Sequence, residues 1–258
     1  MNVALLETGT ARADSSDKSR SAGQAPGAFQ TKWRALATDY DGTIATHGHV
    51  DDATHAALRR LKSAGAPVLL VTGRELRDFP GLNVDLSLFD VVVAENGGLL
   101  FFPGSNETRL LGAAPKPEFI DCLHRRGVGP ISVGACIVAT WEPHEVVVME
   151  TIKDLGLELS VIFNKGAVMI LPTGINKASG LEAALETLHL DAAEVVAVGD
   201  AENDHAFLEA CGLRVAVANA LPALKEHADH VTAAGHGAGV VELIGGLLGG
   251  AFDHFRRG

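Results

Sequence analysis

The feature that most constrains this chain is a regular alternation, from Trp33 onward, between short apolar runs and segments with helical patterns. The first apolar runs are ALAT, PVLLVTG and FDVVVAENG, and a helical pattern, DATHAALRRLKSAG, lies between the first two. The alternation returns near the C-terminus, where EVVAVGD and LRVAVAN are the apolar runs. Strands that alternate with helices form a parallel sheet covered by helices. The sequence therefore predicts an α/β fold with a doubly wound, Rossmann-like parallel sheet.

The alternation is interrupted after Gly98. The sequence there contains LLFF, a turn at PGSN, two helical patterns and the paired runs LELSVIF and AVMIL. This rhythm predicts an inserted, smaller α+β domain with its own antiparallel sheet. Before Trp33, the Ala-, Ser-, Gly- and Thr-rich composition is typical of disorder. The predicted organisation is a disordered tail over 1–31, a first core segment over 32–104, the inserted domain over 105–172 and a second core segment over 173–258.

Composition and charge exclude several classes of partner. Lys and Arg number 21 against 32 Asp and Glu, which gives a net charge of −11. Nucleic acids and anionic membranes are bound through basic residues, so neither is an expected partner. No apolar run approaches the roughly 20 residues of a membrane-spanning helix, and no basic residue precedes the short apolar start. We therefore predict a cytoplasmic protein, and nothing in the sequence selects an oligomeric state.

The cysteines argue against two kinds of site. Cys122, Cys136 and Cys211 are widely spaced and form no CxxC pair. Neither a disulfide framework nor a thiolate zinc site is therefore expected, and reduced thiols are.

Two aspartates follow the first predicted strand. In ALATDYDGTIA the apolar run ends at Asp39-Tyr40-Asp41-Gly42-Thr43. Residues i and i+2 of a strand share a face, so Asp39 and Asp41 project together and repel unless a cation or a proton lies between them. Open α/β sheets place their sites at this end of the strands. The alternative is an Asx-turn that closes the strand.

Groups suited to phosphate follow the second strand and begin a later helix. PVLLVTGRE ends in Thr72, Gly73 and Arg74, which offer a hydroxyl and loop amides. Lys177 stands at a helix start, where the helix dipole gives a lysine no benefit. The alternatives are an ordinary strand-to-helix turn and a solvated surface lysine.

A second acidic group follows a later strand. EVVAVGDAENDHAF carries Asp200 at the strand end and Asn203 and Asp204 as the next helix begins. Acidic residues in a first helical turn also serve simply to complement the helix dipole.

Taken together, these residues resemble the haloacid dehalogenase (HAD) superfamily of phosphohydrolases. The family has four motifs in order: a DxDGT strand end, a strand ending in Thr or Ser, a Lys, and a GDxxND strand end. The resemblance runs from about Ala35 to Ile244. Glu95-Asn96-Gly97-Gly98, after the third core strand, and the run VAVANALPALKEHADHVT resemble the Cof-type branch, in which an α/β cap is inserted at that point.

The resemblance implies a mechanism. Asp39 is the nucleophile and a metal ligand, and Asp41, through its backbone carbonyl, and Asp200 complete the protein ligands of Mg²⁺. Asn203 and Asp204 orient those ligands. Asp41 is also the general acid and base, a role that needs a carboxyl pKa raised by its acidic neighbours. Oxygen ligands without His or Cys favour magnesium over zinc.

The resemblance also implies how the substrate is held. Lys177 and the Thr72 hydroxyl bind the transferring phosphoryl oxygens, and Gly73, Arg74 and Asn96 are candidates for substrate contact. The inserted domain closes over the site. Its own candidates are Trp141, Glu142, His144 and the hairpin turn over 163–166.

The expected activity is Mg²⁺-dependent hydrolysis of a small phosphomonoester through an aspartyl-phosphate. Sugar phosphates come first by resemblance, and phosphoglycolate or another small acid phosphate is the alternative. A catalytically silent HAD-fold binding or scaffold module is an alternative of another class. A two-component receiver domain and a DxD glycosyltransferase rank lower, because the former does not fit the order of the motifs and the latter leaves Lys177 and Asp200 unexplained.

Overall fold

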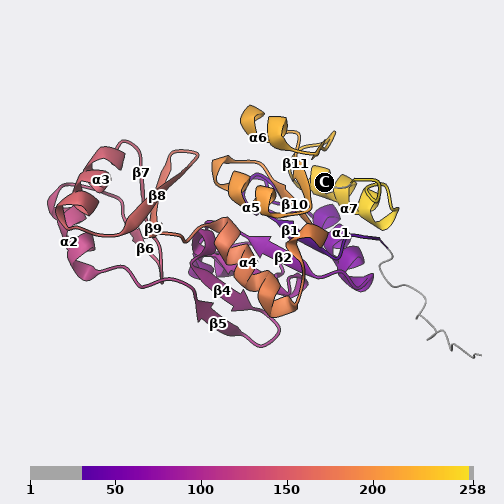
Figure 1. The fold of residues 1–258 in the computed structure, drawn as a ribbon, viewed down its shortest axis with the longest axis horizontal. Helices are drawn as coiled ribbons and strands as arrows, with labels where there is room; N and C mark the ends of the chain where they lie inside the picture. The colour runs from indigo at the N-terminus through magenta and orange to yellow at the C-terminus, as the bar shows by residue number, and fades with distance from the viewer. Residues whose placement is uncertain (1–30, 256–258) are drawn as a thin grey trace, which may run out of the picture.

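The structure is a computed structural model that describes residues 31–255, and its two β-sheets lie apart along the long axis of the molecule (Figure 1). The strands of the larger sheet, in spatial order, are β12 (His230–Val231), β11 (Leu213–Ala216), β10 (Val195–Gly199), β1 (Ala35–Thr38), β2 (Val68–Val71), β3 (Val91–Ala94), β4 (Leu99–Phe102) and β5 (Glu107–Leu110). From β12 to β3 neighbouring strands are parallel, whereas β4 and β5 are antiparallel additions.

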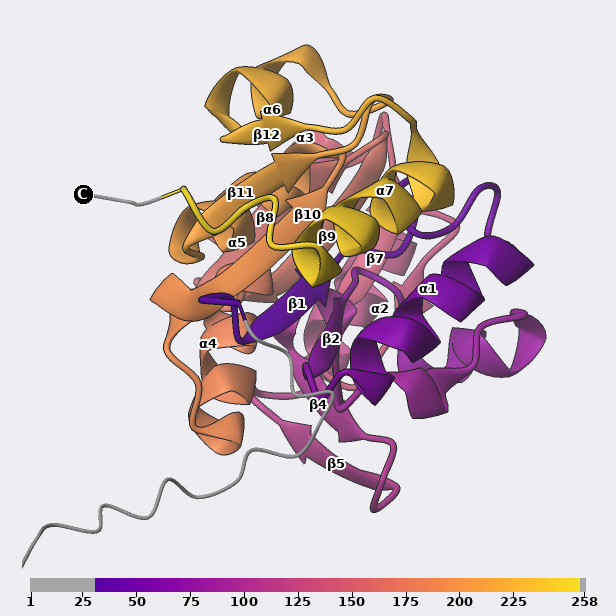
Figure 2. The ribbon, with the colours of Figure 1, turned by 90° about the vertical axis from the view of Figure 1, so that its right-hand side faces the viewer.

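Helices cover both faces of the larger sheet (Figure 2). On one face α1 (Asp52–Ser63) and α7 (His236–Leu248) pack together, and on the other α4 (Lys177–Leu188) packs on α5 (His205–Ala210). A short α6 (Pro222–His227) follows β11. The predicted doubly wound α/β core is therefore confirmed.

The central strands are buried along their whole length. Every residue of β1, β2, β3 and β10 is buried, because helices cover the sheet on both sides. This explains why these strands appear in the sequence as continuous apolar runs rather than as alternating ones. β1 lies between β10 and β2, so the polar residues that follow these three strands share one edge of the sheet.

The second sheet belongs to a smaller unit, defined here as the segment from α2 to β9. Its four antiparallel strands lie in the order β6 (Ser132–Val133), β7 (Val138–Trp141), β9 (Ala167–Pro172) and β8 (Leu159–Asn164). It also contains α2 (Pro117–Arg125) and α3 (Glu145–Asp154). The helices and the sheet enclose a separate apolar core that includes Phe119, Leu123, Val138, Val148 and Ile170.

One part of the predicted domain organisation differs from the strand pairing. The inserted domain was expected from residue 105, yet β5 (Glu107–Leu110) pairs with β4 in the larger sheet. The runs LLFF and ETRL form a hairpin, so the chain leaves the larger sheet only after Leu110. The domain boundaries otherwise stay a prediction, and the predicted tail lies outside the described residues except for Thr31. Within residues 31–255, no helix combines the length and the apolar character needed to cross a bilayer.

Candidate active site

The ends of β1 and β10 bring two aspartates together. Asp39 directly follows β1 and Asp200 directly follows β10, and these strands are parallel neighbours with Thr38 opposite Val198. The N–H of Asp39 donates to the Val198 carbonyl at 3.0 Å. The two residues therefore lie at one edge of the sheet, as the sequence predicts.

A buried lysine joins two acidic side chains. Lys177 Nζ donates to Oδ1 of Asp39 and to Oδ1 of Asp204, both at 2.6 Å. Asp204 Oδ2 accepts the backbone N–H groups of Asp200 (2.8 Å) and Ala201 (2.9 Å), which fixes its carboxylate. Carboxylate oxygens of Asp39, Asp200 and Asp204 lie within 4.8 Å of one another. We call these three aspartates the acidic cluster.

Local sequence explains how the cluster is built. Asn176 caps α4, since its side chain accepts the N–H groups of Ala178 (2.9 Å) and Ser179 (3.1 Å), and Lys177 is therefore the first helical residue. Gly42 has a positive φ of 94°, and a Cβ there would collide with the Asp200 carboxylate. The glycine after Asp41 thus lets the turn pass close to Asp200.

The electrostatics of the cluster favour an additional cation. Burial, and then the charge of Asp204, raises the pKa of Asp39 to about 7, although Lys177 acts in the opposite direction. Burial also raises the pKa of Asp200. Burial disfavours the charged form of Lys177, but Asp204 and Asp39 outweigh it and raise its pKa above the ordinary lysine value. The cluster thus holds three buried carboxylates and one buried ammonium, which bonds to two of them.

The donor set fits magnesium. The cluster offers carboxylate oxygens, and the Asp41 carbonyl lies beside it, because one ammonium, that of Lys165, contacts both Asp41 O (3.0 Å) and Asp200 Oδ2 (2.8 Å). Hard oxygen donors of this kind suit Mg²⁺, and neither His nor Cys belongs to the cluster. Asp39, Asp200 and the Asp41 carbonyl are the groups that would hold the ion.

Asp41 has a cationic partner of its own. Arg74 donates from Nε to Asp41 Oδ2 (2.6 Å) and from a terminal nitrogen to Oδ1 (2.7 Å). The guanidinium also lies 5.4 Å from the centre of the Tyr40 ring. Asp41 was expected to be surrounded by acidic neighbours, and the structure pairs it instead with a guanidinium in a bidentate contact.

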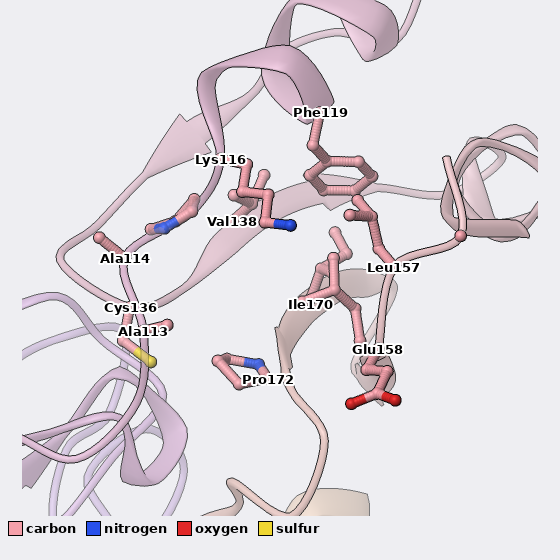
Figure 3. A pocket seen from close by; sticks show the side chains of 13 residues that line it. Ala113, Ala114, Lys116, Phe119, Cys136, Val138, Leu157, Glu158, Ile170 and Pro172 are labelled. Atoms are coloured by element: carbon pink, nitrogen blue, oxygen red, sulfur yellow. The ribbon is translucent and has the colours of Figure 1, made fainter. Parts of the chain in front are cut away.

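A cavity of about 480 Å³ lies between the larger sheet and the smaller unit. The core contributes Asp39, Asp41, Thr72, Gly73 and Arg74 to its lining, and the smaller unit contributes Trp141, Asn164, Lys165 and Met169 among others. A second cavity of about 360 Å³ lies between the smaller unit and the segment that leads into it, residues 113–116, and Phe119, Leu157 and Ile170 give it apolar walls (Figure 3). None of the aspartates of the acidic cluster lines this second cavity. The first cavity is therefore the candidate active site.

Comparison with known proteins decides the family. A family model described as haloacid dehalogenase-like hydrolase matches residues 36–114 and 135–244. The chain belongs to this family. The phosphoglycolate phosphatase of Methanothermobacter thermautotrophicus is 37% identical over 84% of this chain and 99% of its own length. That of Haloarcula marismortui is 34% identical over 81% and 95%. A haloacid dehalogenase-like hydrolase from Bacteroides thetaiotaomicron has the same fold, with a TM-score of 0.73 at 20% identity over 83% of this chain and 98% of its own.

These findings confirm three predictions: the HAD superfamily, its Cof-type branch, and the class of enzyme, a phosphoric monoester hydrolase.

In this HAD hydrolase, Thr72 is buried and its hydroxyl accepts the N–H of Arg74 at 3.1 Å. Asn96 and Asn203 bond to each other (Nδ2 of Asn203 to Oδ1 of Asn96, 2.9 Å), and neither lines the cavity. The predicted substrate contact of Asn96 therefore has no geometric support.

The candidates in the smaller unit differ in where they lie. Trp141 and Lys165 line the cavity, whereas Glu142, His144 and Phe163 do not. The His144 ring contacts the backbone of Gly129 instead.

Two residues near the cluster were missed or underrated by the sequence analysis of this HAD hydrolase. Lys165 was noted only as part of a hairpin turn, yet its ammonium reaches Asp41 and Asp200. Asn219 appears in the sequence analysis only as the last residue of the run LRVAVAN, and its side chain donates to the Gly42 carbonyl at 2.8 Å. Asn219 follows β11 closely, so the same strand-end argument that identified Asp200 would have found it.

Proposed function

We propose that this HAD hydrolase is a Mg²⁺-dependent phosphatase that removes the phosphoryl group of a small phosphomonoester through an aspartyl-phosphate on Asp39. The observation that carries the proposal is the buried contact of Lys177 with both Asp39 and Asp204, beside Asp200. A buried cluster of this kind costs stability, because each charge must leave bulk water. A role in binding an ion and a phosphate accounts for this cost.

In the first step an oxygen of Asp39 attacks phosphorus and the bond from phosphorus to the leaving oxygen breaks. Lys177 donates to Asp39 Oδ1, so we assign the attack to Oδ2. The bound Mg²⁺ would neutralise charge on the phosphoryl oxygens. Lys177 and the hydroxyl of Thr72 stabilise the same oxygens, and Thr72 lines the cavity.

Asp41 supplies and then removes a proton. Its carboxyl group protonates the departing alcohol oxygen, and the resulting carboxylate takes a proton from the water that attacks the phosphorus of the aspartyl-phosphate. Inorganic phosphate leaves, and Asp39 and protonated Asp41 are restored. Arg74 donates to both carboxylate oxygens of Asp41, so at least one of these hydrogen bonds must break before Asp41 transfers a proton.

We place phosphoglycolate first among the substrates and sugar phosphates second, the reverse of the order drawn from sequence. The relatives that match nearly over their whole length carry the name phosphoglycolate phosphatase. Arg74 and Lys165 also give the cavity two cations that suit a second acidic group. For sugar phosphates, Trp141 offers the cavity an exposed flat apolar surface that suits a sugar ring.

A phosphate-release assay tests the proposal. Wild type and Asp39→Asn are compared with Mg²⁺ on phosphoglycolate, several sugar phosphates and an aryl phosphate, and we expect the variant to be slower by roughly 10³-fold or more. Asp78→Asn removes the same charge from the same cavity outside the acidic cluster and is the matched control. Equal turnover by wild type and Asp39→Asn would exclude Asp39 as the nucleophile. No turnover of any substrate would favour the silent scaffold.

The proposal includes a cytoplasmic location and no nucleic-acid partner. Cys122, Cys136 and Cys211 form no disulfide with one another, which agrees with a reducing compartment. The net charge of −11 disfavours binding to nucleic acid.

A further inference from the structure

A lysine from the smaller unit reaches the acidic cluster of the larger sheet. The β8–β9 hairpin has a two-residue turn, Lys165 and Gly166, with φ values of 50° and 82°. Both positive values are typical of the tight type I′ hairpin turn. The turn delivers Lys165 Nζ to 3.0 Å from the Asp41 carbonyl oxygen and 2.8 Å from Asp200 Oδ2.

These two oxygens are the ones proposed above to hold Mg²⁺ together with Asp39. An ion held by these two oxygens would share both of them with the ammonium of Lys165. Two cations on the same oxygens repel each other. We propose that Lys165 competes with the divalent ion for Asp41 and Asp200, so that docking of the β8–β9 turn and metal binding oppose each other. This inference rests on the proposed function.

The exposure of the two side chains shows that Lys165, rather than Asp200, can move when an ion binds. The Lys165 side chain is 44% exposed, whereas that of Asp200 is 4% exposed. Asp200 is also held by the Thr43 hydroxyl at 3.2 Å. Lys165 can therefore withdraw into the cavity or the solvent, and Asp200 stays in place.

The residues around Lys165 leave room for its contact with Asp200. A Cβ on Gly42 would lie 2.7 Å from Lys165 Nζ, so only glycine at position 42 leaves room for the ammonium. Lys177 bonds to Asp39 and Asp204 but not to Asp200, so Lys165 is the lysine that neutralises Asp200.

The rest of the smaller unit has its own attachments to the core. Glu95 accepts the backbone N–H groups of Ala135, Cys136 and Ile137, and the hydroxyl of Ser132 donates to Glu75. The β8–β9 turn can therefore move away with Lys165 while these contacts stay intact. A freed Lys165 would then face substrate in the cavity.

Direct measurement of metal affinity tests the inference. Mg²⁺ binding to the full chain without substrate is measured by calorimetry, and Mn²⁺ binding by electron paramagnetic resonance. Lys165→Met and Lys165→Gln are expected to bind either ion about tenfold more tightly than wild type. Lys153→Met removes an equal charge from an exposed position in the same smaller unit and is expected to leave the dissociation constant unchanged. An unchanged or weaker affinity in both Lys165 variants overturns the inference, as does an equal gain in Lys153→Met.

Hydrogen exchange provides a second readout. Saturating Mg²⁺ is expected to increase amide exchange at residues 164–167 of wild type and to leave residues 135–137 unchanged. No increase at 164–167 would contradict the competition.

The two proposals fail in different ways. Tight metal binding with an equal dissociation constant in wild type and the Lys165 variants, together with phosphatase activity, overturns the competition and leaves the proposed function standing. Absence of both metal binding and phosphatase activity overturns the proposed function and this inference with it.

Discussion

Asp39 occupies a position that is costly for a carboxylate. It is buried beside Asp200 and Asp204, and its close cation, Lys177, is shared with Asp204. Desolvation of buried charges usually exceeds what a buried ion pair returns. The arrangement therefore costs stability, and this cost is measurable as a dependence of stability on pH.

The raised pKa of Asp39 predicts that metal-free protein loses stability as the pH rises. The pKa is about 7 in the folded chain against 3.8 for an ordinary aspartate, so the folded state binds more protons between about pH 4 and 7. Its contribution to the free energy of unfolding is complete below this window and lost through it, with a slope of at most about 1.4 kcal/mol per pH unit for one proton. Urea unfolding with a chelator should show a smaller slope for Asp39→Asn than for wild type.

Asp78→Asn is the control for that measurement, since its side chain is exposed and lies outside the acidic cluster. A difference in stability between wild type and Asp39→Asn that stays constant from pH 4 to 7 would contradict the assignment.

At the scale of residues, the sequence predicted the site residues that follow core strands. It did not predict the contact that forms where the smaller unit packs on the core. Asp39 and Asp200 were predictable because each directly follows a strand of a parallel sheet. The contact of Lys165 with Asp200 depends on how the smaller unit sits on the core, which no local pattern encodes. Arg74 and Asp41 follow two neighbouring core strands, so the strand-end argument places them at one edge of the sheet but does not predict their bidentate contact.

Among the elements, α4 decides where Lys177 lies. Its first turn packs backbone against backbone on the segment that follows β3. A Cβ on Gly180 would lie 2.5 Å from Gly97 Cα and 2.6 Å from a methyl group of Val93. Such contacts require a shift of the backbone, so the position of the helix, and with it the position of the Lys177 ammonium, depends on this glycine.

Gly180→Ala is therefore expected to destabilise the protein by about 1–3 kcal/mol and to weaken Mg²⁺ binding, because it pushes α4 away from the core. Denaturant unfolding and calorimetric metal titration measure the two effects. Gly245→Ala in α7 is the matched control, since a Cβ there meets nothing within 4 Å. That control should be neutral or up to about 1 kcal/mol more stable. A Gly180→Ala variant as stable as wild type would show that α4 can accept a Cβ at this position without moving.

The β4–β5 hairpin shows that the alternation of strands and helices does not predict which sheet a strand joins. The predicted strand LLFF and turn PGSN were correct, but the following run, ETRL, was assigned to the inserted domain. β5 is exposed throughout and has no apolar face to mark its partner sheet. Its place follows from pairing with β4, which the alternation of strands and helices does not reveal.

For the whole molecule, a group of polar contacts helps to attach the smaller unit to the core. Glu95, at the end of β3, accepts N–H groups of Ala135 (2.9 Å), Cys136 (2.7 Å) and Ile137 (3.1 Å) from the β6–β7 turn. Its carboxylate is buried, so these hydrogen bonds replace water and fix the turn on the core.

Glu95→Gln should loosen this attachment. An amide places N–H donors where carboxylate oxygen accepted, which leaves at least one backbone N–H unpaired and costs about 1–3 kcal/mol. Amide exchange at residues 135–137 is expected to accelerate, and Glu150→Gln, an exposed position on α3, is the control. Unchanged exchange in Glu95→Gln would mean that packing alone holds the turn.

The strand order also sets a sequence of events during synthesis on the ribosome. β1 pairs with β2 on one side and with β10 on the other, and the whole smaller unit is translated before β10. Until β10 is made, the β10 side of β1 has no partner strand in the nascent chain. Unpaired strand edges can pair with strands of other molecules. Asp39, the proposed nucleophile, is the first residue of the site to be made and among the last to be enclosed.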